Sequence, residues 1–382
     1  MSNSDGRIVS HDYKRIVVKA GTSLLTGGTG RLDMPVISNI VTQICALQNK
    51  NKEITLVSSG AVAAGREVIG KFTLEKKLSK QALASIGQGR LIQVYEKLFS
   101  AKNILSAQAL VSRRDVGDRL GYLNLRNTLL ELLSNNVVPV VNENDVVALE
   151  ELAGKVFGDN DTLSALVANL VDADLLVILG KVNGLYTKDP TLHNDAKVIS
   201  VVEKLDQGVS SYAGPSSDDF GRGGMLTKIE AARLATASGV DVVMASGYED
   251  NALIRIFNGE NVGTLFKATT TKLESRKRWM LSAIDFTTNS IAIKIDNGAN
   301  DALVKGSSLL PPGVISCSGE FSRGEIVAIV NHKNDIIGVG ITNYSMADIS
   351  EIKSFNSSDI EKMIGHYYGD EIIHRDNLVL LD

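Results

Sequence analysis

The chain has 382 residues, a formal net charge of −4 and 44% hydrophobic residues, which suits full-sized hydrophobic cores and favours two domains. A nearly neutral chain gives no reason to expect nucleic acid or a membrane as its main partner. Residues 1–15 lack the apolar core of a signal peptide, and no apolar run is long enough to span a bilayer. The two cysteines, Cys45 and Cys317, show neither a disulfide pattern nor a metal-binding spacing. We therefore expect a cytoplasmic protein with two ordinary buried thiols.

Short apolar runs alternate with longer amphipathic segments in the first part of the chain. Nearly continuous apolar runs, most of them β-branched, occur at 15–20, 54–58, 137–141, 175–179 and 240–245. Such runs are typical of parallel strands that are covered on both faces. Amphipathic segments occur at 35–49, 120–134 and 225–238. The alternation predicts an α/β fold, a three-layer αβα sandwich with a mainly parallel sheet.

The character of the sequence changes after residue 267. Residues 268–273 (ATTTKL) are small and polar, as in a linker. Turn residues then separate short apolar runs at 290–295, 326–330 and 336–341, and one helical stretch occurs at 357–364. We therefore predict a first domain at 1–267, a linker at 268–275 and a small, mostly-β domain at 276–382.

Ligands bind beyond the carboxyl ends of the strands in an open parallel sheet, so the residues that follow each apolar run carry the most information. The first run ends at 19–23 (KAGTS), which offers one cation and several backbone N–H groups to phosphate oxygens. Many buried strands, however, also end in a solvated lysine. The second run continues into 58–65 (SSGAVAAG), where small residues admit a ligand close to the backbone and a helix start attracts anions. A tight strand–helix turn is the alternative there.

Carboxylates and amides cluster after the third run, at 142–145 (NEND) and 158–161 (GDND). Such clusters bind an ammonium group or a metal, or orient a lysine, although the same residue types also form solvated turns. A glycine-rich turn at 221–224 (GRGG) precedes a predicted helix that carries Lys228 in its first turns. A lysine there opposes the helix dipole unless an anion lies nearby, which favours a phosphate-binding role over a structural one.

Several catalytic motifs are absent from the sequence. It contains no Gly-x4-Gly-Lys-Ser/Thr P-loop, no strand-bound Gly-x-Gly-x-x-Gly with an acidic follower, no His-Glu-x-x-His and no Gly-x-Ser-x-Gly. What remains is a pair of well-separated lysines, glycine-rich turns and acidic clusters. This set of residues is typical of enzymes that catalyse phosphoryl transfer, in which positioning and charge neutralisation supply most of the catalysis.

Together these motifs resemble the amino acid kinase family, over nearly the whole chain from Val17 to Asp376. The resemblance is carried by the combination VKAGTS, SSGAVAAGRE, NEND, GDND and GGMLTK. The C-terminal part resembles the PUA domain of many bacterial members, through RKRW at 276–279, GSSLLP at 306–311 and FSRGE at 321–325. The resemblance implies the amino acid kinase fold and ATP-dependent phosphorylation of the γ-carboxylate of L-glutamate, the first step of proline biosynthesis.

The resemblance assigns Lys19 and Lys228 to the transferring phosphoryl group, and Asp161 to holding both lysines in place. It assigns L-glutamate to Ser59, Asn142, Asp145, Asp159 and Asn160. It assigns ATP to Lys19, Gly21, Gly180, Lys181, Arg222, Gly223, Gly224, Met225 and Lys228. Magnesium would accompany ATP without a metal cage built from protein alone. The substrate carboxylate is already ionised at neutral pH, so the reaction requires no general base.

The sequence departs from the family pattern on the nucleotide side. Gly180 and Lys181 stand where related kinases usually have Thr-Asp or Ser-Asp, and Arg222 stands where a small residue is usual. Both changes bring cations to a loop that is expected to meet ATP. They predict either added phosphate contacts or an altered nucleotide preference.

Two alternatives stay open on the sequence. A related kinase that acts on another carboxylate, a carbamate or a nucleotide would share most of the motifs, and a non-catalytic RNA-binding metabolite sensor would share the PUA domain. The short basic run at 276–278 lies beside Trp279 without the clustered basic face of a strong RNA-binding surface, which favours a structural or regulatory appendage. The family further suggests a homo-oligomer, either dimer or tetramer, and proline as a feedback inhibitor.

Overall fold

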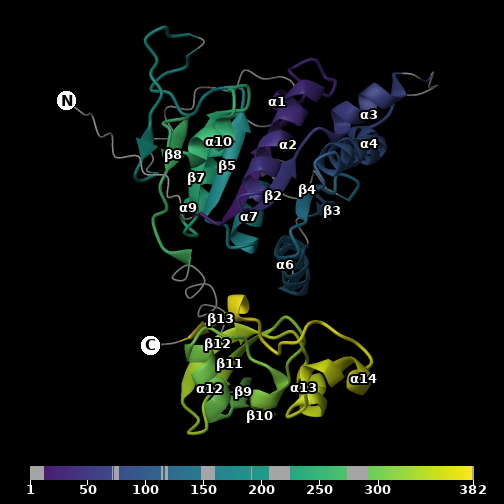
Figure 1. The fold of residues 1–382 in the computed structure, drawn as a ribbon, viewed down its shortest axis with the longest axis vertical. Coiled ribbons are helices and arrows are strands. Elements are labelled where there is room, and N and C mark those ends of the chain that lie inside the picture. The colour runs from purple at the N-terminus through teal and green to yellow at the C-terminus, as the bar shows by residue number, and fades with distance from the viewer. Residues whose placement is uncertain are drawn as a thin grey trace. The chain divides into compact units, whose positions relative to one another are not determined.

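The structure of the chain is a computed structural model, and it describes residues 13–70, 72, 77–112, 115–116, 119–147, 160–190, 192–205, 224–272 and 291–380. Contacts between residues divide the chain into two compact units (Figure 1). The larger unit comprises Met1–Val116 and Leu125–Lys272, and the smaller unit comprises Gly117–Asn124 and Leu273–Asp382.

Within the described residues, the larger unit contains an eight-stranded sheet in the order β3-β4-β2-β1-β5-β7-β8-β6. Its strands are β1 (Arg15–Ala20), β2 (Glu53–Ser58), β3 (Ser106–Val111), β4 (Val138–Glu143), β5 (Leu175–Gly180), β6 (Val201–Val202), β7 (Asp241–Ser246) and β8 (Thr264–Phe266). The described pairings are parallel except for β7 with β8. The central strands β1, β2, β5 and β7 are almost completely buried, which explains their continuous apolar sequences.

Helices cover both faces of this sheet. They include α1 (Thr22–Leu25), α2 (Met34–Gln48), α3 (Ala61–Ile69), α4 (Lys80–Ser100), α7 (Asn160–Leu170), α9 (Met225–Thr236) and α10 (Ala252–Phe257). Helix α6 (Arg119–Ser134) belongs to the smaller unit up to Asn124 and to the larger unit from Leu125 onward. Helices α2, α4 and α10 share a hydrophobic core with one face, and α7 and α9 pack together over the other (Figure 1). Successive residues of a strand point to opposite faces, so Val18 joins the first core whereas Lys19 points toward α7. The predicted three-layer αβα sandwich is confirmed.

The smaller unit is built on a second sheet, in the order β10-β9-β11-β12-β13. Its strands are β9 (Ala292–Ile295), β10 (Val314–Ser318), β11 (Ile326–Val330), β12 (Ile336–Ile341) and β13 (Leu378–Leu380), and its helices include α12 (Asn297–Val304), α13 (Met346–Ile352) and α14 (Ile360–Ile364). Leu123 is fully buried against Ile326, Val339 and Ile341 of this sheet. The predicted small, mostly-β fold is confirmed. In the described part of the chain, no helix is both long and apolar enough to cross a bilayer.

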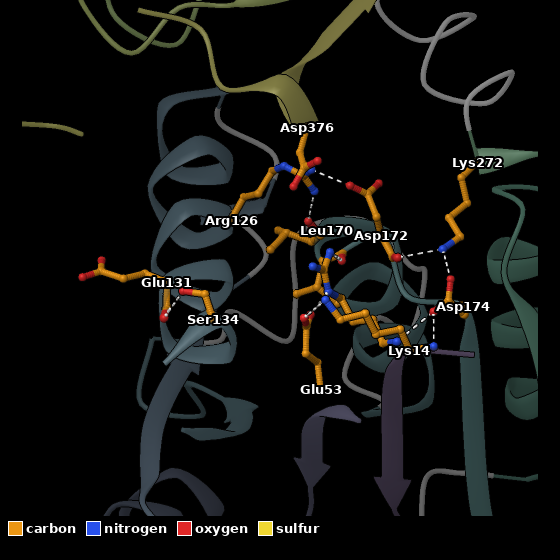
Figure 2. Close-up of polar contacts among 12 residues, drawn as sticks. Lys14, Glu53, Arg126, Glu131, Ser134, Leu170, Asp172, Asp174, Lys272 and Asp376 are labelled. Carbon is orange, nitrogen blue, oxygen red and sulfur yellow. Dashed lines mark hydrogen bonds and ion pairs between the residues drawn. The ribbon is translucent and has the colours of Figure 1, made fainter. Parts of the chain in front are cut away.

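Charged residues tie the amino ends of the central strands together in the larger unit (Figure 2). Asp174 accepts hydrogen bonds from the backbone N–H groups of Lys14 and Arg15, both at 2.7 Å, and forms an ion pair with Lys272. Burial alone would raise the pKa of Asp174, but the Lys272 ammonium and these N–H groups lower it below its ordinary value. Lys272 also donates to the carbonyl of Asp172 at 2.9 Å. Asp174 therefore joins the start of β1 to the segment that follows β8.

The lowered pKa of Asp174 predicts a pH-dependent contribution to stability. A carboxyl whose folded pKa is depressed stabilises the fold above its unfolded pKa, near 4, and that contribution is lost as the pH falls through the folded pKa. We expect the urea midpoint of the wild type to fall as the pH drops below about 5, and that of Asp174→Asn to fall less. Asp195→Asn, in an exposed pair with Lys188, is the matched control and should follow the wild type. Parallel curves for Asp174→Asn and the wild type would contradict this assignment.

Candidate active site

Three charged side chains from separate elements meet near the carboxyl ends of β1 and β5. Asp161, in the first turn of α7, directs one carboxylate oxygen to the ammonium group of Lys19 on β1. Its other oxygen, Oδ2, lies 3.4 Å from Nζ of Lys228 in the first turns of α9. Thr227 Oγ1 donates a further hydrogen bond to the same oxygen at 2.9 Å. One carboxylate thus holds two lysines that are 209 residues apart in the chain.

Asp161 is fully buried and Lys19 is only 3% exposed. Burial alone would raise the pKa of the Asp161 carboxyl, but the charges of Lys19 and Lys228, with hydrogen bonds from Lys19 and Thr227, hold the pKa well below its usual range. The carboxylate therefore stays ionised at neutral pH. It also compensates the unfavourable position of Lys228 near a helix N-terminus.

Glycines admit these lysines to the site. A Cβ atom at Gly21 would lie 3.1 Å from Nζ of Lys19, so a side chain there would crowd the ammonium group. A Cβ atom at Gly180 would lie 3.5 Å from Cε of Lys228. The absence of side chains leaves room beside both cations at the ends of β1 and β5.

Uncharged polar side chains cluster beside the lysines. Asn160, which opens α7, donates from Nδ2 to Ser59 Oγ at 2.6 Å, to Asn142 Oδ1 at 3.1 Å and to the Ser58 carbonyl at 3.2 Å. Asn142 in turn donates from Nδ2 to Gln88 Oε1 at 2.8 Å. The other amide atom of Asn160, Oδ1, is buried and has no hydrogen-bond partner among the described residues. A buried acceptor of this kind can take a hydrogen bond from a ligand or from an ordered water.

The turn between β2 and α3 adds a place for an anion next to this cluster. Gly60 has a φ of 105°, a left-handed conformation that glycine adopts at little cost, and it places α3 directly after Ser59. No side chain caps the N-terminus of α3. The backbone N–H groups of a helix start attract negative charge, so this turn suits a carboxylate.

A hollow of about 610 Å³ lies beyond the ends of β5 and β7. It is lined by Lys181, Val182, Asn183, Tyr186, Ser246, Tyr248, Glu249, Asp250 and Arg255. Lys181 also reaches the glycine-rich loop after α1, since its Nζ would lie 3.2 Å from a Cβ atom at Gly28. A cation thus stands between the hollow and that loop, on the side where the sequence predicts the nucleotide.

The predicted site residues fall into several groups in the structure. It brings together Lys19, Asp161 and Lys228. It also brings together Ser59, Asn142 and Asn160. Gly180 and Lys181 end and follow β5, Gly21 precedes α1, Gly224 and Met225 begin α9, and Asp145 lies in the turn after β4. Asp159, Arg222 and Gly223 lie outside the described residues.

Two further residues in these contacts were not among the predicted site residues. Thr227 directly precedes Lys228, and its place in the GGMLTK motif was a signal that sequence reasoning could have used. Gln88 gave no such signal, because a glutamine inside an amphipathic helix is ordinarily a solvated residue. Its contact with Asn142 spans 54 residues of sequence.

The chain is similar to several known proteins. Among solved structures, a UMP kinase from Bacillus anthracis matches with a TM-score of 0.47 and 17% identity, over 68% of this chain and 97% of that one. A glutamate 5-kinase from Dehalococcoides mccartyi is 47% identical over 371 residues, which cover 97% of this chain and 99% of that protein. A glutamate 5-kinase from Caldanaerobacter subterraneus is 47% identical over 373 residues, 96% of this chain and 98% of that protein.

Two family models match the chain. The model of the PUA domain matches residues 291–364. The model of the amino acid kinase family matches residues 14–246, which include both lysines and the amide cluster. With relatives of 47% identity over almost the full length, the chain belongs to the amino acid kinase family and carries a PUA domain in its C-terminal part.

Proposed function

We propose that this protein is a glutamate 5-kinase, which transfers the γ-phosphoryl group of ATP to the γ-carboxylate of L-glutamate in the first step of proline biosynthesis. One observation carries the proposal: Asp161 holds Lys19 and Lys228 directly beside the amide cluster whose Asn160 Oδ1 has no partner among the described residues. Two cations suit a transferring phosphoryl group, and the acceptor suits an amino acid. The relatives that bear this name support the same activity.

The geometry supports a reaction by positioning and charge neutralisation. A γ-carboxylate oxygen of glutamate forms a bond to the γ-phosphorus while the bond to the bridging oxygen of ADP breaks. Lys19 and Lys228 neutralise the negative charge that spreads over the phosphoryl oxygens. Asp161 holds both ammonium groups at one place through its two carboxylate oxygens. The attacking carboxylate is ionised at neutral pH, so no residue has to remove a proton.

The hollow beside Lys181 suits ATP on the opposite side of the two lysines from the amide cluster. Both oxygens of Asp161 are already engaged by Lys19, Lys228 and Thr227, so this carboxylate is not arranged as a metal ligand. A magnesium ion would instead arrive with ATP, held chiefly by its phosphates, and would supply further charge neutralisation there. Lys181, which lines the hollow, would add a cation on the same side.

Other features of the assignment stay predictions. They are a cytoplasmic location, assembly into a dimer or tetramer, and feedback inhibition by proline. RNA binding by the PUA domain also stays a prediction, and the described part of that domain offers no observation in its favour.

The dependence of ADP release on the acceptor substrate tests the proposed function. Purified protein with ATP and magnesium should release ADP rapidly with L-glutamate, and at least a hundredfold more slowly with L-aspartate, N-acetyl-L-glutamate or UMP. A higher rate with one of the other acceptors would identify a related kinase of different specificity. No acceptor-dependent ADP with any of them would favour the metabolite sensor instead.

A further inference from the structure

Gln88 of α4 forms one end of a chain of hydrogen-bonded amides. Its Oε1 accepts from Asn142 Nδ2 at 2.8 Å, and Asn142 Oδ1 accepts from Asn160 Nδ2 at 3.1 Å. Asn142 is only 3% exposed. An amide donor buried at this position without a partner would be costly, so Gln88 is what allows Asn142 to stay in its present orientation.

A single backbone carbonyl sets the direction of every bond in this chain. A carbonyl oxygen only accepts hydrogen bonds, so the Asn160 atom that lies 3.2 Å from the Ser58 carbonyl must be Nδ2. Asn142 must then present Oδ1 to Asn160 and Nδ2 to Gln88, and Gln88 must present Oε1. The arrangement leaves Asn160 Oδ1 as a buried acceptor without a partner among the described residues.

The same face of α4 also contacts the residue at the other end of this row of hydrogen-bonded amides. Tyr95 follows Gln88 by seven residues, about two helical turns, so both side chains lie on one face. The Tyr95 hydroxyl is 2.8 Å from Ser58 Oγ, and its ring is fully buried. Leu91, between them, is also buried. Helix α4 therefore contacts Ser58 through Tyr95 and Asn142 through Gln88.

We propose that Gln88 is a positioning residue that sets the preference of this site for an α-amino acid. The inference rests on the proposed function. The α-ammonium is the only hydrogen-bond donor of L-glutamate, because both carboxylates are ionised, and it is therefore the group that suits Asn160 Oδ1. Gln88 holds Asn142, Asn142 restrains Asn160, and Asn160 keeps its free acceptor directed at the ammonium group. Gln88 itself touches no substrate.

The test compares L-glutamate with glutarate, which is the same diacid without the amino group. The measurements are the KM for L-glutamate and the inhibition constant of glutarate against it. In Gln88→Leu we expect the KM for L-glutamate to rise about tenfold, with kcat, the KM for ATP and the glutarate constant changed less than about twofold. Gln88→Glu retains an acceptor for Asn142 and should restore the wild-type ratio. Gln93→Leu, at an exposed position of the same helix, is the matched control and should resemble the wild type.

Equal weakening of L-glutamate and glutarate in Gln88→Leu would show a merely structural role, as would a Gln88→Glu variant that fails to restore the ratio. Either result overturns the inference. Circular dichroism establishes folding, and if Gln88→Leu does not fold, Gln88→Ala replaces it, because alanine is the best helix former and Gln88 is only half-buried. A wild type that phosphorylates no L-glutamate contradicts the proposed function, whereas an active wild type with an unchanged ratio in the variants contradicts this inference alone.

Discussion

Replacing Lys228 with alanine is expected to lower kcat by about a thousandfold and to change the KM for L-glutamate by less than about threefold. The ammonium group of Lys228 lies 3.4 Å from Asp161 Oδ2, and its side chain lies beside Gly180 at the end of β5. Its partner is the charge that grows on the phosphoryl oxygens as the transfer proceeds. An interaction that strengthens only in the transition state lowers kcat when it is removed and leaves the binding of the substrate nearly intact.

The matched control for this variant is Arg233→Ala, which removes a partly exposed cation from the last turn of the same helix. We expect its kcat to equal that of the wild type within about twofold. Steady-state kinetics with both substrates varied would separate the two constants. If Lys228→Ala raised the KM for L-glutamate by the same factor as it lowered kcat, Lys228 would be a structural residue and the proposed mechanism would be wrong.

A methyl group at Gly87 is expected to destabilise the protein by about 3 kcal/mol, with a fall in Tm of about 5 to 10 °C. Helices α3 and α4 approach each other so closely that a Cβ atom at Gly87 would lie 1.8 Å from the Ala61 carbonyl oxygen and 2.3 Å from the Gly65 nitrogen. Both contacts are with backbone, so the two helices would have to move apart. That movement would displace Gln88 and the turn before α3, and we expect glutamate binding to weaken as well.

Gly89 provides the matched control, because it lies two residues further along the same helix. A Cβ atom at Gly89 would have no neighbour within 4 Å. Alanine is favoured over glycine inside a helix by about 0.5 to 1 kcal/mol, so Gly89→Ala should raise the Tm slightly. Thermal unfolding followed by circular dichroism measures both variants. A Gly87→Ala variant as stable as Gly89→Ala would mean that the two helices do not pack as described.

The parts of the fold that sequence patterns predicted are those with strong, continuous signals. The apolar runs at 15–20 and 175–179 are buried on both faces, and burial on both faces is what removes polar residues from a strand. Strand β3 was missed because it lies at the edge of the sheet, where exposed positions keep polar residues such as Gln108 and interrupt the apolar pattern. Strand β6 has only two residues, too few for any period to show.

The sequence indicated which residues lie together at the candidate site, but not how those residues are arranged. The motif resemblance singled out Lys19, Asp161 and Lys228, but not the division of the two Asp161 oxygens between the lysines, nor the part of Thr227. Gln88 was not predicted as a site residue because no local pattern distinguishes a glutamine that faces a distant strand from one that faces water. The closeness of α3 and α4 was similarly hidden, since small residues in a helix do not reveal which backbone they admit.

The most direct test of the central claim is the chemical identity of the product. With ATP, magnesium, L-glutamate and hydroxylamine, an acyl phosphate is trapped as a hydroxamate, whose position mass spectrometry determines. A glutamate 5-kinase is predicted to form γ-glutamyl hydroxamate in a one-to-one ratio with ADP, and the Lys228→Ala protein only traces of it. Formation of ADP without this hydroxamate, or a hydroxamate on the α-carboxylate, would contradict the claim.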